Sequence, residues 1–115
     1  MKVVPVDIMA DWLENGFERK NFDWDKYNIL KLTKHEVAQE EINSLFENNF
    51  YFAGRILEPD GVDFEEKRYL IFGVIPNGLY FAIVCTRREE RIRPISCRRM
   101  RNNERTIYDT ATKRI

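Results

Sequence analysis

Arginine is the residue type in this sequence with the clearest chemical potential, because arginines concentrate in one half of the chain. Residues 1–66 contain 7 Lys and Arg against 15 Asp and Glu, whereas residues 67–115 contain 12 against 4. A guanidinium group binds phosphate or carboxylate through two parallel hydrogen bonds. We therefore expect the C-terminal half to bind a polyanion, and nucleic acid first. The arginines concerned are Arg68, Arg87, Arg88, Arg91, Arg93, Arg98, Arg99, Arg101 and Arg105.

The chain also offers groups that can transfer protons. His35 is the only histidine, and an imidazole gains and loses a proton near neutral pH. Glu104 and Tyr108 are four positions apart, which places both on one face of a helix. RNA can be cleaved without a metal when its own 2′-OH is the nucleophile, provided that the protein supplies a base, an acid and cations for the phosphate. These residues could supply all three.

Other kinds of chemistry have less support in the sequence. It has no Cys, His and Asp cluster with the spacing of metal ligands, no glycine-rich phosphate loop and no Ser, His and Asp set for acyl transfer. Cys85 and Cys97 fall within predicted strands, where a free cysteine behaves as a small buried hydrophobic residue. No apolar run approaches the length of a membrane span, and residues 1–16 do not resemble a secretory signal. We expect a cytoplasmic protein that does not contact a membrane.

Each candidate residue has a structural alternative. The arginines could form ion pairs with the acidic N-terminal half, and His35 could be a solvated residue at a helix end. Glu104 could pair with Arg101 or Arg105, and Tyr108 could belong to the core. The helical arginines Arg99, Arg101 and Arg105 could form a solvated face that also meets an acidic partner. Three classes of function therefore remain open: an enzyme acting on RNA, a nucleic-acid or protein binding module without turnover, and a structural partner of an acidic protein.

Helical patterns dominate the first part of the chain, whose 115 residues predict a single domain. The segment Val6–Asn15 has the spacing of a short amphipathic helix. Phe22–Asp25 alternates as a short strand, and Asp25 is a good N-cap for a basic-faced helix that runs on towards Val37. A second helix is predicted by Ile42, Leu45 and Phe46, at positions i, i+3 and i+4.

From Phe50 onward the apolar period changes to that of strands. The predicted strands are Tyr51–Leu57, Arg68–Ile75, Leu79–Thr86 and Arg91–Ser96, followed by a closing helix at Met100–Asp109. Asn77-Gly78 predicts a hairpin with a type I′ turn, and the acidic run Asp60–Glu66 predicts a solvated loop. Pro94 indicates that the last strand lies at a sheet edge or offers only one side for pairing at that residue. The expected fold class is α+β, with a four-stranded antiparallel meander, two helices before it and one after it.

Several short segments together resemble the BrnT family (DUF497) of type II toxin–antitoxin ribonucleases. The first is Phe22-Asp23-Trp24-Asp25, followed by Asn28, Lys31, Lys34-His35 and Val37. The later ones are Glu66-Lys67-Arg68-Tyr69, Thr86-Arg87, Ile92 to Arg98, and Glu104-Arg105 with Tyr108. Two departures are visible: Glu36 stands where the family usually has Gly, and Cys97 where it usually has Ala. The resemblance covers about residues 21–109, so residues 1–20 are interpreted as an N-terminal extension and 21–115 as the toxin domain.

The resemblance implies a RelE-like fold and an endoribonuclease that inhibits translation without a cofactor or metal. It also implies a cognate BrnA-like ribbon-helix-helix antitoxin that neutralises the toxin, with DNA contacted only through that antitoxin. We expect one basic face to form the site. The predicted catalytic residues are His35, Arg68, Arg87, Arg93, Glu104 and Tyr108. The predicted RNA-binding residues are Lys31, Lys34, Arg98 and Arg99. The alternative is a non-catalytic module that binds nucleic acid or antitoxin through the same face.

Overall fold

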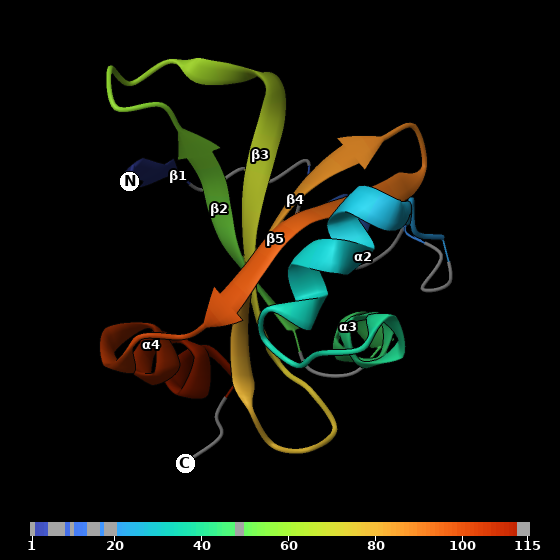
Figure 1. Cartoon of the computed structure of the whole chain (residues 1–115). Coiled ribbons are helices and arrows are strands. Elements are labelled where there is room, and N and C mark those ends of the chain that lie inside the picture. Colours follow the sequence, from blue (N-terminus) through green and yellow to red (C-terminus); the bar gives the residue numbers. More distant parts are fainter. Residues whose placement is uncertain are drawn as a thin grey trace.

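An antiparallel sheet with helices on both of its faces forms the protein (Figure 1). The computed structural model describes residues 2–4, 9, 11–13, 17, 21–47 and 50–112. In these ranges the strands follow each other in the order β1-β2-β3-β4-β5, and each pairs antiparallel with its neighbour. The elements are β1 (Lys2–Val4), α2 (Lys26–Thr33), α3 (Gln39–Glu47), β2 (Phe50–Leu57), β3 (Asp63–Val74), β4 (Tyr80–Arg88), β5 (Arg91–Arg99) and α4 (Asn102–Thr112). This confirms the α+β prediction with its four-stranded meander, to which β1 adds a short fifth strand.

Helix α2 begins at the predicted N-cap and ends earlier than predicted. Asp25 accepts hydrogen bonds from the backbone N–H groups of Tyr27 and Asn28, and the Asn28 side chain accepts one from the Asp25 N–H. The helix stops at Thr33 because Glu36 takes a left-handed conformation, with φ of 55°. The Val37 N–H then donates to the Leu32 carbonyl at 3.2 Å, which closes the helix end as in a Schellman motif.

The predicted strand at Phe22–Asp25 is wrong, because only one residue of it pairs with the sheet. Phe22 forms an isolated parallel bridge with Ile92. The Asp23 N–H donates to the Ile92 carbonyl at 2.8 Å, and the Ile92 N–H donates to the Asn21 carbonyl. Asp25 already serves as the cap of α2, so the extended segment has no further length for pairing. It nevertheless fixes the start of α2 against β5.

The hairpin between β3 and β4 lies where it was predicted, but its turn is not of type I′. A type I′ turn requires positive φ at both Asn77 and Gly78, and only Gly78 has it, with φ of 89°. The Gly78 N–H donates to the Ile75 carbonyl, so Pro76 and Asn77 are the central residues of the turn. Proline fixes φ near −65° and therefore excludes a primed turn here.

Two further boundaries differ from the prediction. β3 begins at Asp63, so part of the acidic run Asp60–Glu66 is strand rather than loop. β5 continues to Arg99 and is the last strand of the sheet, which confirms the edge position predicted from Pro94. The Pro94 ring lacks an N–H and is tolerated there because the outer side of an edge strand needs no ladder hydrogen bond at that residue.

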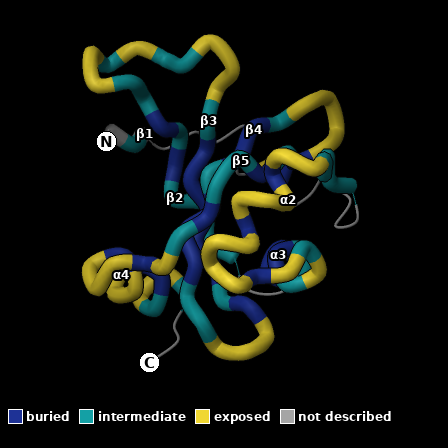
Figure 2. Tube along the Cα trace, in the orientation of Figure 1, coloured by how far each residue is buried: buried dark blue, intermediate teal, exposed yellow. Residues whose placement is uncertain are grey.

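Each face of the sheet has its own apolar cluster, and Figure 2 shows the buried residues following the strands between the helices. Helices α2 and α3 cover one face, called the α2/α3 face, where Ile42, Leu45 and Phe46 are buried as predicted. Gly73 leaves the space that Leu45 occupies there, since a Cβ at this position would overlap the Leu45 side chain. Helix α4 covers part of the opposite face, called the α4 face, around Leu70, Phe72, Ala82 and Tyr108.

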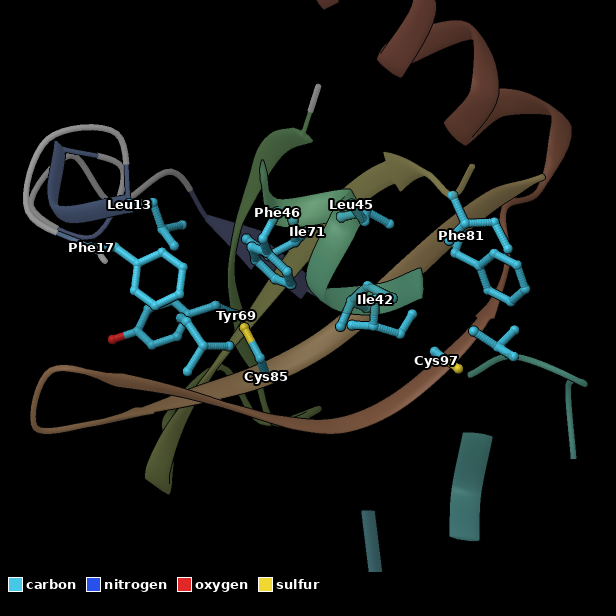
Figure 3. Packing of buried hydrophobic residues seen from close by; sticks show 14 of the residues in the cluster. Leu13, Phe17, Ile42, Leu45, Phe46, Tyr69, Ile71, Phe81, Cys85 and Cys97 are labelled. Atoms are coloured by element: carbon cyan, nitrogen blue, oxygen red, sulfur yellow. The ribbon is translucent and has the colours of Figure 1, made fainter. Parts of the chain in front are cut away.

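Residues near the N-terminus contribute to the first of these clusters. Met9, Trp12, Leu13 and Phe17 are buried in it, and Figure 3 shows Leu13 and Phe17 beside Tyr69. Most of the helix predicted at Val6–Asn15 lies outside the described residues. These four side chains therefore pack on the same core as the sheet.

Candidate functional site

The candidate arginines divide between the two faces of the sheet. Cross-strand partners in an antiparallel ladder point to the same side. Arg68 lies opposite Ile56 and Arg98 opposite Ala82, and both of these partners belong to the cluster of the α4 face. Arg93 lies opposite Thr86, which is two positions from Val84 of the same cluster. The structure therefore brings Arg68, Arg93 and Arg98 to the α4 face.

Arg98 is held by Glu104 at the start of α4. Its Nη1 and Nη2 donate to the two carboxylate oxygens of Glu104 at 2.6 and 2.8 Å. Glu104 also accepts a hydrogen bond from the Arg101 N–H at 2.8 Å, as the N3 residue of a capping box does. The hydrogen bonds from Arg98 hold the pKa of Glu104 below its ordinary value of 4.5. Both oxygens of this ionised carboxylate accept hydrogen bonds, so Glu104 holds Arg98 in place and is a weak proton acceptor.

Tyr108 lies one helical turn beyond Glu104 and is fully buried. Its ring meets the Tyr80 ring edge to face, with centroids 5.8 Å apart. The Tyr80 hydroxyl donates to Asp109 at 3.0 Å. Glu104 and Tyr108 thus lie on one face of α4, as their spacing predicted, and both contact the sheet.

Arg93 sits in an ion-pair network at the other end of β5. Its Nη2 donates to Asp25 at 2.7 Å, and its side chain is 17% exposed. The neighbouring Arg88 binds both carboxylate oxygens of Glu66 at 2.8 and 3.1 Å. The pKa of Asp25 is lowered by its hydrogen bond from the Asn28 N–H and then by Arg93. Arg93 therefore forms an ion pair with the acidic N-terminal half, as the structural alternative predicted. Arg88 and Arg93 nevertheless lie close together at this end of the α4 face.

Arg68 has a different environment from Arg93. Its guanidinium lies 4.3 Å from the centre of the Phe64 ring. The described residues give it no carboxylate within ion-pair distance. Such a stacked guanidinium keeps its N–H edge available for an anion.

Arg87 is separated from the other strand arginines. Its cross-strand partner Ile92 belongs to the α2/α3 face. The guanidinium lies 4.0 Å over the Trp12 ring, and Nη2 donates to Glu90 at 3.1 Å. Glu90 in turn accepts a hydrogen bond from Trp12 Nε1 at 2.9 Å. Arg87 therefore joins the β4–β5 turn to the N-terminal region.

His35 lies near the end of β5 rather than among the arginines of the α4 face. It is exposed just after α2, and its ring meets Phe81 at 6.5 Å with the planes at 85°. The Arg99 guanidinium lies 5.8 Å from the same Phe81 ring. Lys31 and Lys34 are exposed on and just after α2. The structure thus groups His35 with Arg99, and separately groups Arg68, Arg93 and Arg98 with Glu104 and Tyr108.

Two hollows flank the start of α4. One, of about 360 Å³, includes Tyr80, Arg99 and Arg105. The other, of about 370 Å³, has an apolar floor that includes Tyr51 and Phe72, with Arg101 at its edge. Sequence reasoning treated Arg105 as a solvated residue and did not single out Tyr80. The spacing of Arg101 and Arg105, one helical turn apart and close to the end of a strand, was the available signal.

The described part of the chain contains no group of three His, Cys, Asp or Glu side chains placed to hold a metal ion. None of its helices is long and apolar enough to cross a membrane. Cys85 and Cys97 are both free and buried, and burial raises their pKa values to about 12 and about 11. A thiol of such high pKa is a poor nucleophile.

Comparison with known protein families identifies a match over most of the chain. The family model described as "Ribonuclease toxin, BrnT, of type II toxin-antitoxin system" matches residues 22–104. No curated protein and no solved structure matches the chain significantly. The RelE-like label of the fold therefore stays a prediction.

Proposed function

Because the chain belongs to the BrnT family of ribonuclease toxins from type II toxin–antitoxin systems, we propose that it is an endoribonuclease that cleaves RNA without a metal. Cleavage of cytoplasmic mRNA would inhibit translation. The observation that carries this proposal is the family match over residues 22–104, which includes His35 and all strand arginines of the candidate site. The arginine-rich face described above supports it on physical grounds.

In the proposed reaction the substrate's own 2′-oxygen attacks the adjacent phosphorus, and the 5′-oxygen leaves. A base removes the 2′-OH proton, an acid protonates the leaving oxygen, and cations stabilise the charge that develops on the phosphate. The exposed imidazole of His35 beside Arg99 is the proton-transfer group of this proposal. Arg99, opposite Phe81, supplies the positive charge beside His35 in this proposal, and Lys31 and Lys34 extend the RNA contact along α2. Arg68, Arg93 and Arg98 lie on the α4 face and would contact RNA away from the reacting phosphate.

In this proposal the other predicted catalytic residues, Glu104, Tyr108 and Arg87, have structural roles. Glu104 fixes the guanidinium of Arg98, and Tyr108 anchors α4 on the sheet. Arg87 stabilises the turn that precedes β5 through Glu90 and Trp12. A role for Glu104 or Tyr108 in proton transfer would require their present contacts to open.

Membership of a type II system implies an antitoxin partner. We propose that this partner is a BrnA-like ribbon-helix-helix protein whose acidic surface covers the arginines and blocks RNA. A second function, binding without turnover, has one specific observation in its favour. Arg87, Arg88, Arg93 and Arg98 each have a carboxylate within 3.1 Å, which is the arrangement of a structural network.

Regulated expression in bacteria tests the proposal. Induction of the wild-type chain should arrest growth and deplete cellular mRNA, and co-expression of the antitoxin from the same operon should restore growth. A catalytic reading predicts that His35→Asn relieves the arrest while the protein accumulates in folded form. A well-folded wild-type product that causes no arrest and leaves mRNA intact would favour the binding module.

A further inference from the structure

The hollow of about 370 Å³ beside the start of α4 has features that the proposed reaction does not use. Its apolar lining comes from three strands and from α4, where Ile107 is exposed. Figure 1 shows α4 beside one end of the sheet, on the side opposite α2 and α3. Both the volume and the mostly apolar lining are typical of a site for a small organic group.

Two aromatic rings from neighbouring strands form part of the floor. Tyr51 on β2 is paired with Phe72 on β3, and their ring centroids lie 6.4 Å apart with the planes at 32°. Phe72 is buried, whereas Tyr51 is only partly buried, so part of its side chain is accessible to a ligand. An aromatic side chain can stack on any nucleobase, because every base has a π-face.

The edge of the hollow carries polar side chains that are free to bind a ligand. Arg101 and Asn103 both line the hollow, and both are exposed. In the described part of the chain, neither side chain forms a hydrogen bond or an ion pair. A guanidinium and a carboxamide are the two side-chain groups that form paired hydrogen bonds with the polar edge of a base.

Glu104 also lines the hollow, but its charge is already balanced. Its two oxygens accept hydrogen bonds from Arg98, and one of them also accepts the Arg101 N–H. The carboxylate therefore presents little free negative charge to a polyanion. It also holds the Arg98 guanidinium beside the hollow.

Arg68 places a second cation on the strand that contributes to the floor. It precedes Leu70 by two positions on β3 and therefore lies on the same face, roughly 7 Å away along the strand. Its guanidinium stacks on the Phe64 ring at 4.3 Å. The described residues give it no carboxylate within ion-pair distance, so it is available to a phosphate that flanks the hollow.

We propose that this hollow binds a base of the RNA chain, stacked on Tyr51 and bonded at its edge by Arg101 and Asn103. The inference rests on the proposed function and gives the α4 face, which lies away from His35, the task of holding a substrate base. An apolar side chain of a protein partner would fill the floor but would make no use of the two polar side chains. A base uses both, and the phosphate next to it meets Arg68.

Binding of a fluorescent 2′-O-methyl oligoribonucleotide tests the inference, because this probe has no free 2′-OH and cannot be cleaved. The comparison probe is an abasic oligomer with the same number of phosphates, which has the charge without the bases. Tyr51→Leu and Asn103→Ala should each weaken binding of the first probe about 5- to 10-fold and leave binding of the abasic probe unchanged. The salt slope should stay the same, because no phosphate contact is removed.

Two conservative variants are the matched controls. Tyr51→Phe keeps the ring, and Asn102→Ala changes an exposed neighbour on α4 that does not line the hollow. Both should bind the two probes as the wild type does. Thermal melting checks the fold of every variant, and Asn103→Ala keeps the test decisive if Tyr51→Leu is unstable, because Asn103 is exposed.

The outcomes separate this inference from the proposed function. Wild-type binding in Tyr51→Leu and Asn103→Ala would overturn the inference even if the protein cleaves RNA, and so would an equal loss with the abasic probe. Loss of antitoxin binding with unchanged oligonucleotide binding would assign the hollow to a protein partner and also overturn it. A wild type that cleaves no RNA, but whose base-dependent binding is lost in both variants, would sustain the base site and contradict the nuclease.

Discussion

Both carboxylate oxygens of Glu104 accept hydrogen bonds from the guanidinium of Arg98, at 2.6 and 2.8 Å. The same carboxylate accepts the Arg101 N–H, so one side chain joins the end of β5 to the first turn of α4. Its side chain is only 9% exposed, whereas that of Arg98 is 31% exposed. The ion pair therefore holds the Arg98 guanidinium in place on the α4 face. Glu104 also caps the N-terminus of α4 by accepting the Arg101 N–H.

Replacing Glu104 by Gln should lower the free energy of unfolding more than it lowers the rate of RNA cleavage. The change keeps the size of the side chain but removes the charge that Arg98 faces, and we expect a loss of about 2 kcal/mol in the free energy of unfolding. Urea denaturation measures it, with Glu65→Gln on the exposed part of β3 as the control. A stability equal to that of the wild type, together with a hundredfold loss of cleavage, would instead identify Glu104 as a catalytic residue.

Acid should destabilise the protein through its paired carboxylates. Hydrogen bonds lower the pKa of Glu104, chiefly through Arg98, and that of Glu66, chiefly through Arg88, below the ordinary value of 4.5. A lowered folded-state pKa gives stability that is present above the unfolded pKa and is lost as pH falls through the folded value. The melting temperature should therefore hold between pH 7 and about pH 5 and fall below about pH 4.5. Glu104→Gln should show a shallower acid decline, and an unchanged decline would contradict this assignment.

Glu36→Gly should stabilise the protein. Glu36 has φ of 55°, a left-handed conformation that glycine adopts without the steric cost of a Cβ. We expect a gain of about 1 kcal/mol in the free energy of unfolding. Glu36→Ala is the matched control, because it removes the same charge but keeps the Cβ. Equal stability of the two variants would show that backbone conformation is not the cause.

Thr86→Val should also be stabilising. Thr86 is fully buried opposite Arg93, and its hydroxyl has no hydrogen-bond partner in the described part of the chain. Valine has the same shape without the buried hydroxyl, so we expect a gain of about 1 kcal/mol. Thr86→Ser, which keeps the hydroxyl and removes the methyl group, should be destabilised. A loss of stability in Thr86→Val would show that the hydroxyl makes a bond through water.

Local patterns were sufficient to predict much of the fold. The spacing of Ile42, Leu45 and Phe46 identified α3, the cap at Asp25 fixed the start of α2, and Pro94 identified the edge strand. The early end of α2 was missed because Glu36, unlike glycine, gives no sign that it adopts a left-handed conformation. The turn type failed for a related reason, since Pro76 rather than Asn77 occupies the first central position.

The grouping of the site residues could not be predicted from local patterns. Alternation along β5 indicates which arginines share a face, but it does not indicate which carboxylate each one meets. Arg93 binds Asp25 across 68 positions of sequence, and Trp12 binds Glu90 across 78. Such contacts depend on how the N-terminal region packs on the sheet. The pairing of His35 with Arg99 around Phe81 depends on the same tertiary packing.

The chemical ends of the cleavage products test the central proposal most directly. Purified wild-type protein would be incubated with a defined RNA in the presence of EDTA, and the termini of the fragments would be identified. Attack by the 2′-oxygen predicts cleavage under these conditions, with 2′,3′-cyclic phosphate on one fragment and a 5′-hydroxyl on the other. Cleavage that requires an added divalent ion, or fragments that carry a 5′-phosphate, would contradict the proposed mechanism.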